Sequence, residues 1–221
     1  RERPCGPMST LPDISPELLG TSKVIPVVVL EDAAKAVDLA KALLAGGIEA
    51  IELTFRTKAA AEAIRAVRAE GPEMVVGAGT ILTPAQVDEA VAAGAQFAVA
   101  PGHNQQVTAR ATEKGLPFAP GVMTPTDIEA ALSVGFRTLK FFPAESAGGV
   151  THLKSLIAPY QHMGVRFIPT GGISADLARA YLDLPAVLAV GGSWLTPKDV
   201  IAAGDWGRIT QIARESLAAL A

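Results

Sequence analysis

Cysteine is nearly absent from the sequence, since Cys5 is the only one among 221 residues. A single thiol cannot form an intrachain disulfide, so a disulfide-stabilised fold is excluded and a reducing compartment is expected. The sequence also lacks a run of about 18 apolar residues that could cross a membrane. The first residues lack the apolar segment of a signal peptide. We therefore expect a cytoplasmic protein with no membrane partner.

An excess of charge of one sign is missing as well. The chain has 22 acidic and 19 basic residues, for a formal net charge of -3. Nucleic-acid binding normally needs a basic surplus, so no nucleic-acid partner is expected. Histidine is scarce, and His103, His152 and His162 show none of the spacings typical of a metal site. We expect no metal. Any anionic ligand must be held by local donors.

Short apolar runs alternate with longer amphipathic segments along the chain, as in parallel α/β folds. Eight runs are predicted to be strands: Val24–Val29, Ile48–Leu53, Met74–Ala78, Gln96–Ala100, Pro117–Ala119, Arg137–Phe142, Arg166–Pro169 and Val187–Val190. Helical spacing lies between them, for example over Asp32–Leu44. Eight such units without a linker predict a single (β/α)8 TIM barrel.

Start signals agree with the helices expected between these strands. Thr83-Pro84, Thr124-Pro125 and Thr196-Pro197 each join an N-cap residue to a proline at the first turn. The competing architecture is an open doubly wound sheet, which for a nucleotide ligand needs a glycine-rich turn after the first strand. Leu30-Glu31-Asp32 at that point contains no glycine. The barrel is therefore the predicted fold.

The N-terminal part does not belong to the repeated units. Residues 1–8 are expected to be an extension outside the fold, and residues 9–221 a single catalytic barrel domain. Ser9–Gly20 has the composition of an additional helix, which we expect to close the barrel floor.

Lys140 is the strongest indication of chemistry. It lies within the apolar run Leu139–Pro143, and the chemistry of such barrels occurs at the carboxyl ends of the strands. Burying an ammonium costs free energy and favours the neutral amine that attacks a ketone. The alternative is a lysine whose ammonium reaches solvent beyond the strand.

Glu52 has a similar setting in the second predicted strand. Alternation places its carboxylate on the face shared by Ile48 and Ala50, opposite to Glu49. An inward carboxylate near an inward lysine is either a structural ion pair or a general acid/base. The expected position of both residues at one end of the barrel favours the catalytic role over the structural ion pair.

Arg56 and two glycine pairs indicate anion binding at the same end. A guanidinium after the second strand can hold a carboxylate through two hydrogen bonds, although a surface arginine opening a helix is the alternative. Gly171-Gly172 and Gly191-Gly192 follow the last two predicted strands. The loops after these strands are the usual phosphate site of barrels, and bare backbone N–H groups can bind the phosphate. Tight turns are the other explanation of the pairs.

Five motifs together resemble those of one enzyme family. They are Glu52–Thr57, Val76–Thr80, Lys140–Glu145, Pro169–Ile173 and Gly191–Trp194. From about Val24 onward the sequence resembles the bacterial 2-keto-3-deoxy-6-phosphogluconate (KDPG) aldolases, which are also described as 4-hydroxy-2-oxoglutarate aldolases. The resemblance implies a class I lyase of the Entner–Doudoroff pathway that forms a Schiff base without a metal or other cofactor, is commonly a homotrimer, and acts on a phosphorylated 2-keto acid.

The resemblance also implies roles for individual residues. Lys140 matches the Schiff-base lysine, and Glu52 matches the general acid/base. The residues matching the substrate-binding positions are Arg56, Thr80, Pro101, Phe142, Thr170, Gly171, Gly172, Gly192 and Ser193. Ala100–His103 and Val122–Thr124 depart from the family pattern, which leaves chain length and C4 stereochemistry open, including the galactonate epimer.

Two other functions remain open at this stage. A phosphate-binding barrel isomerase would use Glu52 for proton transfer without a covalent lysine. A non-catalytic barrel would bind a sugar phosphate without turnover. A trapped pyruvate adduct on Lys140 distinguishes the aldolase from both.

Overall fold

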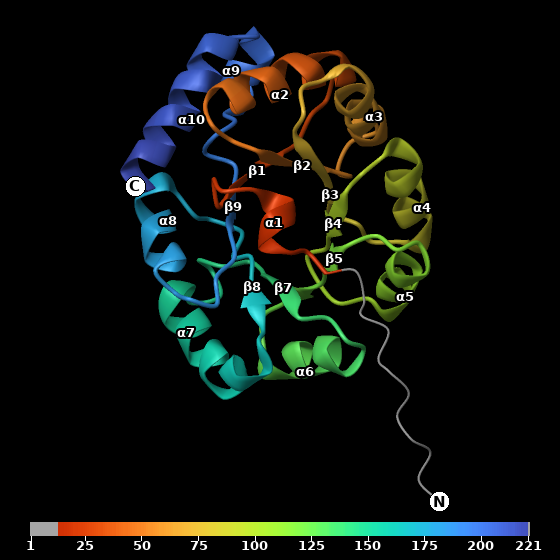
Figure 1. The fold of residues 1–221 in the computed structure, drawn as a ribbon, viewed down its shortest axis with the longest axis vertical. Coiled ribbons are helices and arrows are strands. Elements are labelled where there is room, and N and C mark those ends of the chain that lie inside the picture. Colours follow the sequence, from red (N-terminus) through yellow and green to blue (C-terminus); the bar gives the residue numbers. More distant parts are fainter. Residues whose placement is uncertain (1–12, 221) are drawn as a thin grey trace, which may run out of the picture.

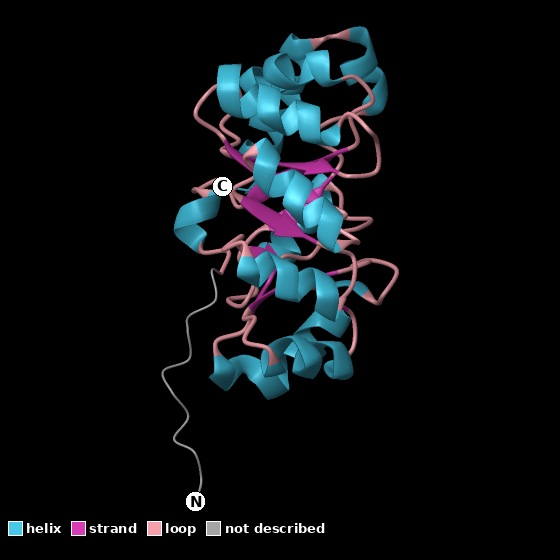
Figure 2. Cartoon of the chain, turned by 90° about the vertical axis from the view of Figure 1, so that its right-hand side faces the viewer, coloured by secondary structure: helices cyan, strands magenta, loops and turns pink. Residues whose placement is uncertain are grey.

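Parallel strands form a central ring surrounded by helices in the computed structural model of the chain, which describes residues 13–220 (Figures 1 and 2). The strands are β1 (Val24–Val28), β2 (Ala50–Thr54), β3 (Val75–Gly79), β4 (Phe97–Val99), β5 (Phe118–Ala119), β6 (Gly121–Val122), β7 (Thr138–Phe141), β8 (Arg166–Phe167) and β9 (Val190–Gly192). The extension expected over residues 1–8 lies outside the described residues.

The helices other than α1 follow the strands around the outside of the ring, and α1 lies at its centre (Figure 1). They are α1 (Pro16–Leu19), α2 (Ala36–Ala45), α3 (Ala60–Glu70), α4 (Pro84–Ala93), α5 (Gln105–Glu113), α6 (Pro125–Ser133), α7 (Gly149–Tyr160), α8 (Ala175–Leu182), α9 (Lys198–Ala203) and α10 (Trp206–Leu220), with the 3-10 turns η1 (Ala33–Lys35) and η2 (Gln161–Met163). The predicted caps Thr83 and Thr124 each form a capping box before a proline.

The strands close into a ring, as the predicted barrel requires. One sheet has the order β5-β4-β3-β2-β1-β9 and the other β6-β7-β8. Only Pro120 separates β5 from β6, and Lys140 N donates to Pro120 O at 2.9 Å. On the other side, parallel bridges join Phe167 to Val187 and Thr170 to Gly191. The (β/α)8 fold is therefore confirmed, with strand five divided at a proline.

Two local predictions for the last βα unit are wrong. The eighth strand was expected over Val187–Val190, but β9 begins at Val190, so Gly191 and Gly192 lie in the strand and pair with Ile25 and Pro26. Thr196 does not cap a helix, because α9 begins at Lys198 after an extended Pro197, and Thr196 Oγ1 is buried without a partner in the described part of the chain.

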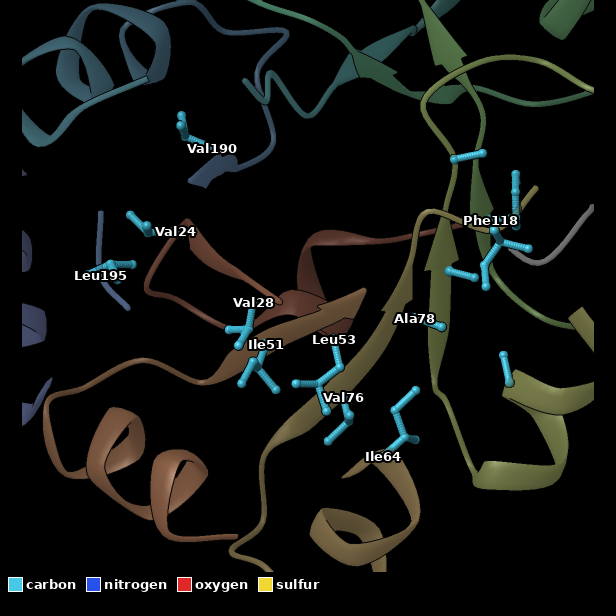
Figure 3. Close-up of a cluster of buried hydrophobic side chains, with 14 of the residues drawn as sticks. Val24, Val28, Ile51, Leu53, Ile64, Val76, Ala78, Phe118, Val190 and Leu195 are labelled. Atoms are coloured by element: carbon cyan, nitrogen blue, oxygen red, sulfur yellow. The ribbon is translucent and has the colours of Figure 1, made fainter. Parts of the chain in front are cut away.

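Two apolar clusters occupy the two faces of the ring. Ile51 and Leu53 point outward to the helices together with Val28, Val76 and other side chains drawn in Figure 3. Inside the ring lies a second cluster: Ile14, Leu19, Ile25, Ala50, Phe97, Val99, Ala119, Ile168 and Ala189. Alternation along each strand separates the two sets. Ile48 belongs to the outer cluster, contrary to its predicted place beside Ala50.

The additional N-terminal helix closes the amino-terminal end of the ring. In Figure 1, α1 lies at the centre of the barrel. Ile14 and Leu19 pack into the inner cluster, and Thr138 Oγ1 donates to Ile14 O at 3.0 Å. The expected closure of the floor is confirmed for the described residues. Since α1 occupies the floor, the interior of the ring is open, within residues 13–220, toward the carboxyl end of the strands.

Candidate active site

Lys140 and Glu52 meet inside the ring, toward its carboxyl end. Lys140 lies on β7 two residues above Thr138, and its Nζ is 3.0 Å from Glu52 Oε1 and 3.3 Å from Oε2. The two side chains are 6% and 4% exposed. This excludes the alternative in which the ammonium reaches solvent. The amine and the carboxylate are placed so that a proton can pass between them.

A glycine provides the space that the Glu52 carboxylate occupies. Thr54 pairs with Gly79 in the β2–β3 register, and Glu52 pairs with Gly77. A Cβ at Gly79 would overlap Glu52 Oε1 and lie 2.7 Å from Glu52 Cδ. Any larger residue at this position would therefore displace the carboxylate. The sequence motif contained Gly79, but nothing in the motif indicated that the Glu52 side chain fills the space beside this glycine.

The turns after β2 and β3, which carry Arg56 and Thr80, are adjacent. Phe55 N donates to Gly79 O at 2.8 Å, so the residues that follow lie on adjacent turns. Thr80 has a φ of 59°, a left-handed conformation that costs free energy in a β-branched residue and is concentrated at functional sites. Arg56 is exposed in the turn between β2 and α3, four residues before the helix begins at Ala60, so it does not open that helix.

A cleft of about 470 Å³ opens beside Arg56. Its walls include seven of the residues predicted to bind substrate: Arg56, Phe142, Thr170, Gly171, Gly172, Gly192 and Ser193. Lys140 Nζ lies 5.8 Å from the centre of the Phe142 ring, so Phe142 connects the amine to the cleft. Thr80 and Pro101 do not line it. Pro101 instead packs on Gly121, where a Cβ would overlap the Pro101 carbonyl.

The glycines of the cleft have different structural roles. Gly171 and Gly172 have φ values of 107° and 77°, which an L side chain rarely adopts. Gly191 and Gly192 are in extended β9, and a Cβ there would overlap Thr170 Oγ1 or the Trp194 ring. The first pair fits an exposed backbone turn, and the second permits close packing inside the strand. The prediction that both pairs form loops is thus wrong for the second.

Glu145 fixes the loop after β8 from the side of β7. Its backbone N donates to Gly171 O at 3.0 Å, and its carboxylate accepts a hydrogen bond from the Tyr181 hydroxyl of α8. Burial, with that hydrogen bond, raises the pKa of Tyr181 above its usual range. The loop with the left-handed glycines is therefore held at both ends.

The substrate-binding prediction left out six further residues of the cleft: Val27, Val29, Ile173, Ser174, Trp194 and Lys198. Val27 and Val29 of the β1 region and Lys198 at the start of α9 line it. The valines resemble ordinary strand residues, so the sequence gives no signal for them. Lys198 follows a Thr-Pro pair that was interpreted only as a helix start. Its nearness to Ser193 in the chain was the available signal.

The histidines show no sign of a metal centre. Among residues 13–220, no group of three or more His, Cys, Asp or Glu side chains could hold a metal ion. His103 Nε2 lies 3.5 Å from Thr108 Oγ1. Burial lowers the pKa of His103, and this effect outweighs the negative charge of Asp127, which acts to raise the pKa. His152 packs on Phe141 with ring centres 5.9 Å apart.

Among residues 13–220, no helix is long and apolar enough to cross a membrane.

This geometry is suited to covalent catalysis on a carbonyl compound. A buried amine lies beside a carboxylate toward the carboxyl end of the barrel, and an adjoining cleft offers backbone turns, hydroxyls and a guanidinium. The amine can attack a ketone while the carboxylate exchanges protons, and the cleft can hold an extended anionic substrate.

Comparisons with known proteins agree with this reading. The family described as KDPG and KHG aldolase matches residues 16–212. The KHG/KDPG aldolase of Escherichia coli K12 is 47% identical over 200 residues, which cover 90% of this chain and 93% of that protein.

Solved structures give the same result. A KDPG aldolase from Legionella pneumophila, with pyruvate captured as a covalent carbinolamine, has a TM-score of 0.86 at 38% identity, covering 91% of this chain and 98% of the other. The Zymomonas mobilis enzyme with 3-phosphoglycerate has a TM-score of 0.85 at 40% identity, covering 91% and 94%. With its fold, its buried lysine and these similarities taken together, the chain belongs to the KDPG and KHG aldolase family.

Proposed function

We propose that this protein is a class I aldolase that cleaves KDPG to pyruvate and D-glyceraldehyde 3-phosphate, the aldol cleavage of the Entner–Doudoroff pathway. Cleavage of 4-hydroxy-2-oxoglutarate (KHG) to pyruvate and glyoxylate is proposed as a second activity. The observation that carries the proposal is the buried contact of Lys140 Nζ with both oxygens of Glu52, at 3.0 and 3.3 Å. Family membership and the similarity to an aldolase with a covalent pyruvate intermediate support it.

In the proposed first half-reaction, neutral Lys140 Nζ adds to the C2 ketone and forms a carbinolamine. Glu52 carries a proton to the departing hydroxyl, water leaves, and an iminium remains. The C4 hydroxyl then gives its proton to the Glu52 carboxylate and the C3–C4 bond breaks, because the iminium accepts the electron pair. Glyceraldehyde 3-phosphate departs, and an enamine stays on the lysine.

The second half-reaction regenerates the free amine. The enamine takes a proton at its methylene carbon, which gives the pyruvyl iminium. Water adds to C2 and releases pyruvate. Glu52 is the proposed proton carrier in both halves, since it is the carboxylate that the amine contacts.

Binding groups at a distance from the reacting carbons orient the substrate. Arg56 and Thr80, on adjacent turns, are proposed to hold the carboxylate. Gly171, Gly172, Gly192 and Ser193 are proposed to hold the phosphate, with Phe142, Thr170 and Pro101 around the reacting carbons. Interactions with remote groups lower the barrier by fixing C2 against the amine.

Trapping with borohydride tests the covalent mechanism. The protein is incubated with pyruvate, reduced, and analysed by intact mass and peptide mapping. We expect one reduced pyruvyl adduct on Lys140, and none in the Lys140→Ala variant. No adduct in the folded wild-type protein, or near-normal turnover by Lys140→Ala, would refute the Schiff base. Turnover of both C4 epimers, measured side by side, determines the stereochemistry.

The assembly and compartment are proposals of the same kind. A homotrimer is proposed from the resemblance to the family and is tested by multi-angle light scattering. A cytoplasmic location is proposed from the near absence of cysteine, and fractionation of the source cells tests it.

A further inference from the structure

The charge of the cleft differs in sign from that of the whole chain. Arg56 and Lys198 are its only ionisable lining residues among those described, and no carboxylate lines it. The chain as a whole has a formal charge of -3. A cleft with two cations in an acidic protein is suited to an anionic ligand.

Building on the proposed function, we propose that Lys198 is a specificity-determining residue that recognises the phosphate of the substrate. It lies in the cleft with Gly171, Gly172 and Ser193, the residues that offer backbone N–H groups and a hydroxyl. Those groups are neutral dipoles. Lys198 adds the full positive charge that a phosphate dianion attracts and that an uncharged aldehyde end does not.

The surroundings of Lys198 leave its charge available. Glu31, Asp32 and Lys35 line the pocket on its other side. No ion pair between Lys198 and either carboxylate is present within residues 13–220, and Asp32 instead accepts a hydrogen bond from Ala34 N at 3.0 Å. An exposed lysine without a partner can turn its ammonium toward a ligand in the cleft.

Lys35 fixes the helix that carries Lys198. Its Nζ donates to Ile201 O at 3.3 Å and Ala202 O at 2.8 Å, near the end of α9. This contact occupies the Lys35 ammonium and ties α9 to the segment after β1. Of the two lysines that line the neighbouring pocket, Lys198 also lines the cleft and has its ammonium available for substrate.

The two cations are chemically suited to different anions. Arg56, with its planar fork of donors, suits a carboxylate, whereas the lysine ammonium is a compact charge that can approach phosphate oxygens from several directions. Phe142 places the reacting amine next to the cleft. Removal of the Lys198 charge should weaken binding of a phosphorylated substrate and leave the reaction of pyruvate itself unaffected.

The test compares two reactions in four proteins: wild type, Lys198→Met, Lys198→Arg, and Lys41→Met. Lys41 is an exposed lysine on the outer helix α2, so Lys41→Met makes the same change in net charge away from the cleft. For each protein, kcat and KM for KDPG cleavage are measured at low and high salt. The pyruvate concentration that gives half-maximal borohydride trapping is measured in parallel.

We expect Lys198→Met to raise the KM for KDPG about three- to tenfold at low salt, the range for one partly exposed charge acting on a dianion. The increase should shrink at high salt, and pyruvate trapping should change by less than about twofold. Lys198→Arg should recover most of the loss, and Lys41→Met should match wild type.

The failures of the two proposals are distinguishable. An unchanged KM for KDPG in Lys198→Met, or equal losses in cleavage and trapping, overturns the role of Lys198 while the aldolase stands. A wild-type protein that neither traps pyruvate nor cleaves KDPG overturns the proposed function, and the role of Lys198 falls with it.

Discussion

The Lys140–Glu52 pair should reveal itself in stability as well as in catalysis. Both side chains are at most 6% exposed, so each charge depends on the other in place of water. Lys140→Met leaves a buried carboxylate without its cation, and Glu52→Leu leaves a buried ammonium without its anion. Exchanging both residues for apolar side chains of similar size removes both charges together.

The expected magnitudes follow from the cost of an unpaired buried charge. Breaking a buried pair by removing one partner costs about 3–5 kcal/mol, whereas replacing both partners is often neutral or stabilising. Each single variant should therefore unfold about 6–20 °C below wild type, at about 2–4 °C per kcal/mol for a chain of this size. The double variant should lie within about 1 kcal/mol of wild type and be inactive.

Thermal and urea unfolding of the four proteins, at neutral pH, completes this double-mutant cycle. Two results would contradict the reasoning. In the first, the single variants are as stable as wild type. In the second, the free energy of unfolding lost by the double variant equals the sum of the losses of the single variants. Either outcome would mean that the two groups are hydrated and do not compensate each other. Residual activity in the double variant would contradict the proposed role of Lys140.

Two further predictions concern neighbouring groups. Gly79→Ala should lower kcat for KDPG by about tenfold or more, because the alanine Cβ would overlap the Glu52 carboxylate and misplacing a catalytic group by about 1 Å costs about a hundredfold in rate. An unchanged far-UV circular dichroism spectrum shows that the fold persists. A normal kcat would show that the alanine does not displace Glu52. Burial is the main cause that lowers the pKa of His103, so this histidine binds a proton more readily in the unfolded chain, and stability should fall as the pH drops below about 6.5, the ordinary histidine value. Urea unfolding from pH 7.5 to 5 should show that the free energy of unfolding falls less steeply with pH in His103→Asn than in wild type. An equal dependence on pH in the two proteins would rule out this contribution.

The sequence predicted the order of elements because parallel strands carry a simple signal. A strand covered on both faces is a short apolar run, and each of the eight expected runs overlaps a strand of the structure. Polar residues within such runs stand out, so Lys140 and Glu52 could be paired before their 3.0 Å contact was known. Capping boxes at Thr83 and Thr124 were predictable because they depend only on neighbours in the chain.

Features that depend on distant residues were not predictable. Gly191 and Gly192 were placed in the loop after the last strand, because glycine in sequence gives no hint that Thr170 and Trp194 occupy the space of its side chain. Gly79 gives no hint of Glu52 for the same reason. Thr196-Pro197 has the same two residue types as Thr83-Pro84 and Thr124-Pro125, yet Pro197 is extended and the helix begins one residue later, at Lys198. In each case the deciding neighbour comes from tertiary packing.

The closed floor of the barrel limits the traffic of small molecules. Ile14 and Leu19 fill the end opposite the reacting amine, and the ring between them and Lys140 is apolar. Water released when the carbinolamine dehydrates must therefore leave by the opening through which the substrate entered. Under the proposed mechanism, a bound phosphorylated aldehyde obstructs that passage until it departs. Hydrolysis of the enamine-derived iminium then waits for the first product to leave, which protects the intermediate from premature reaction with water.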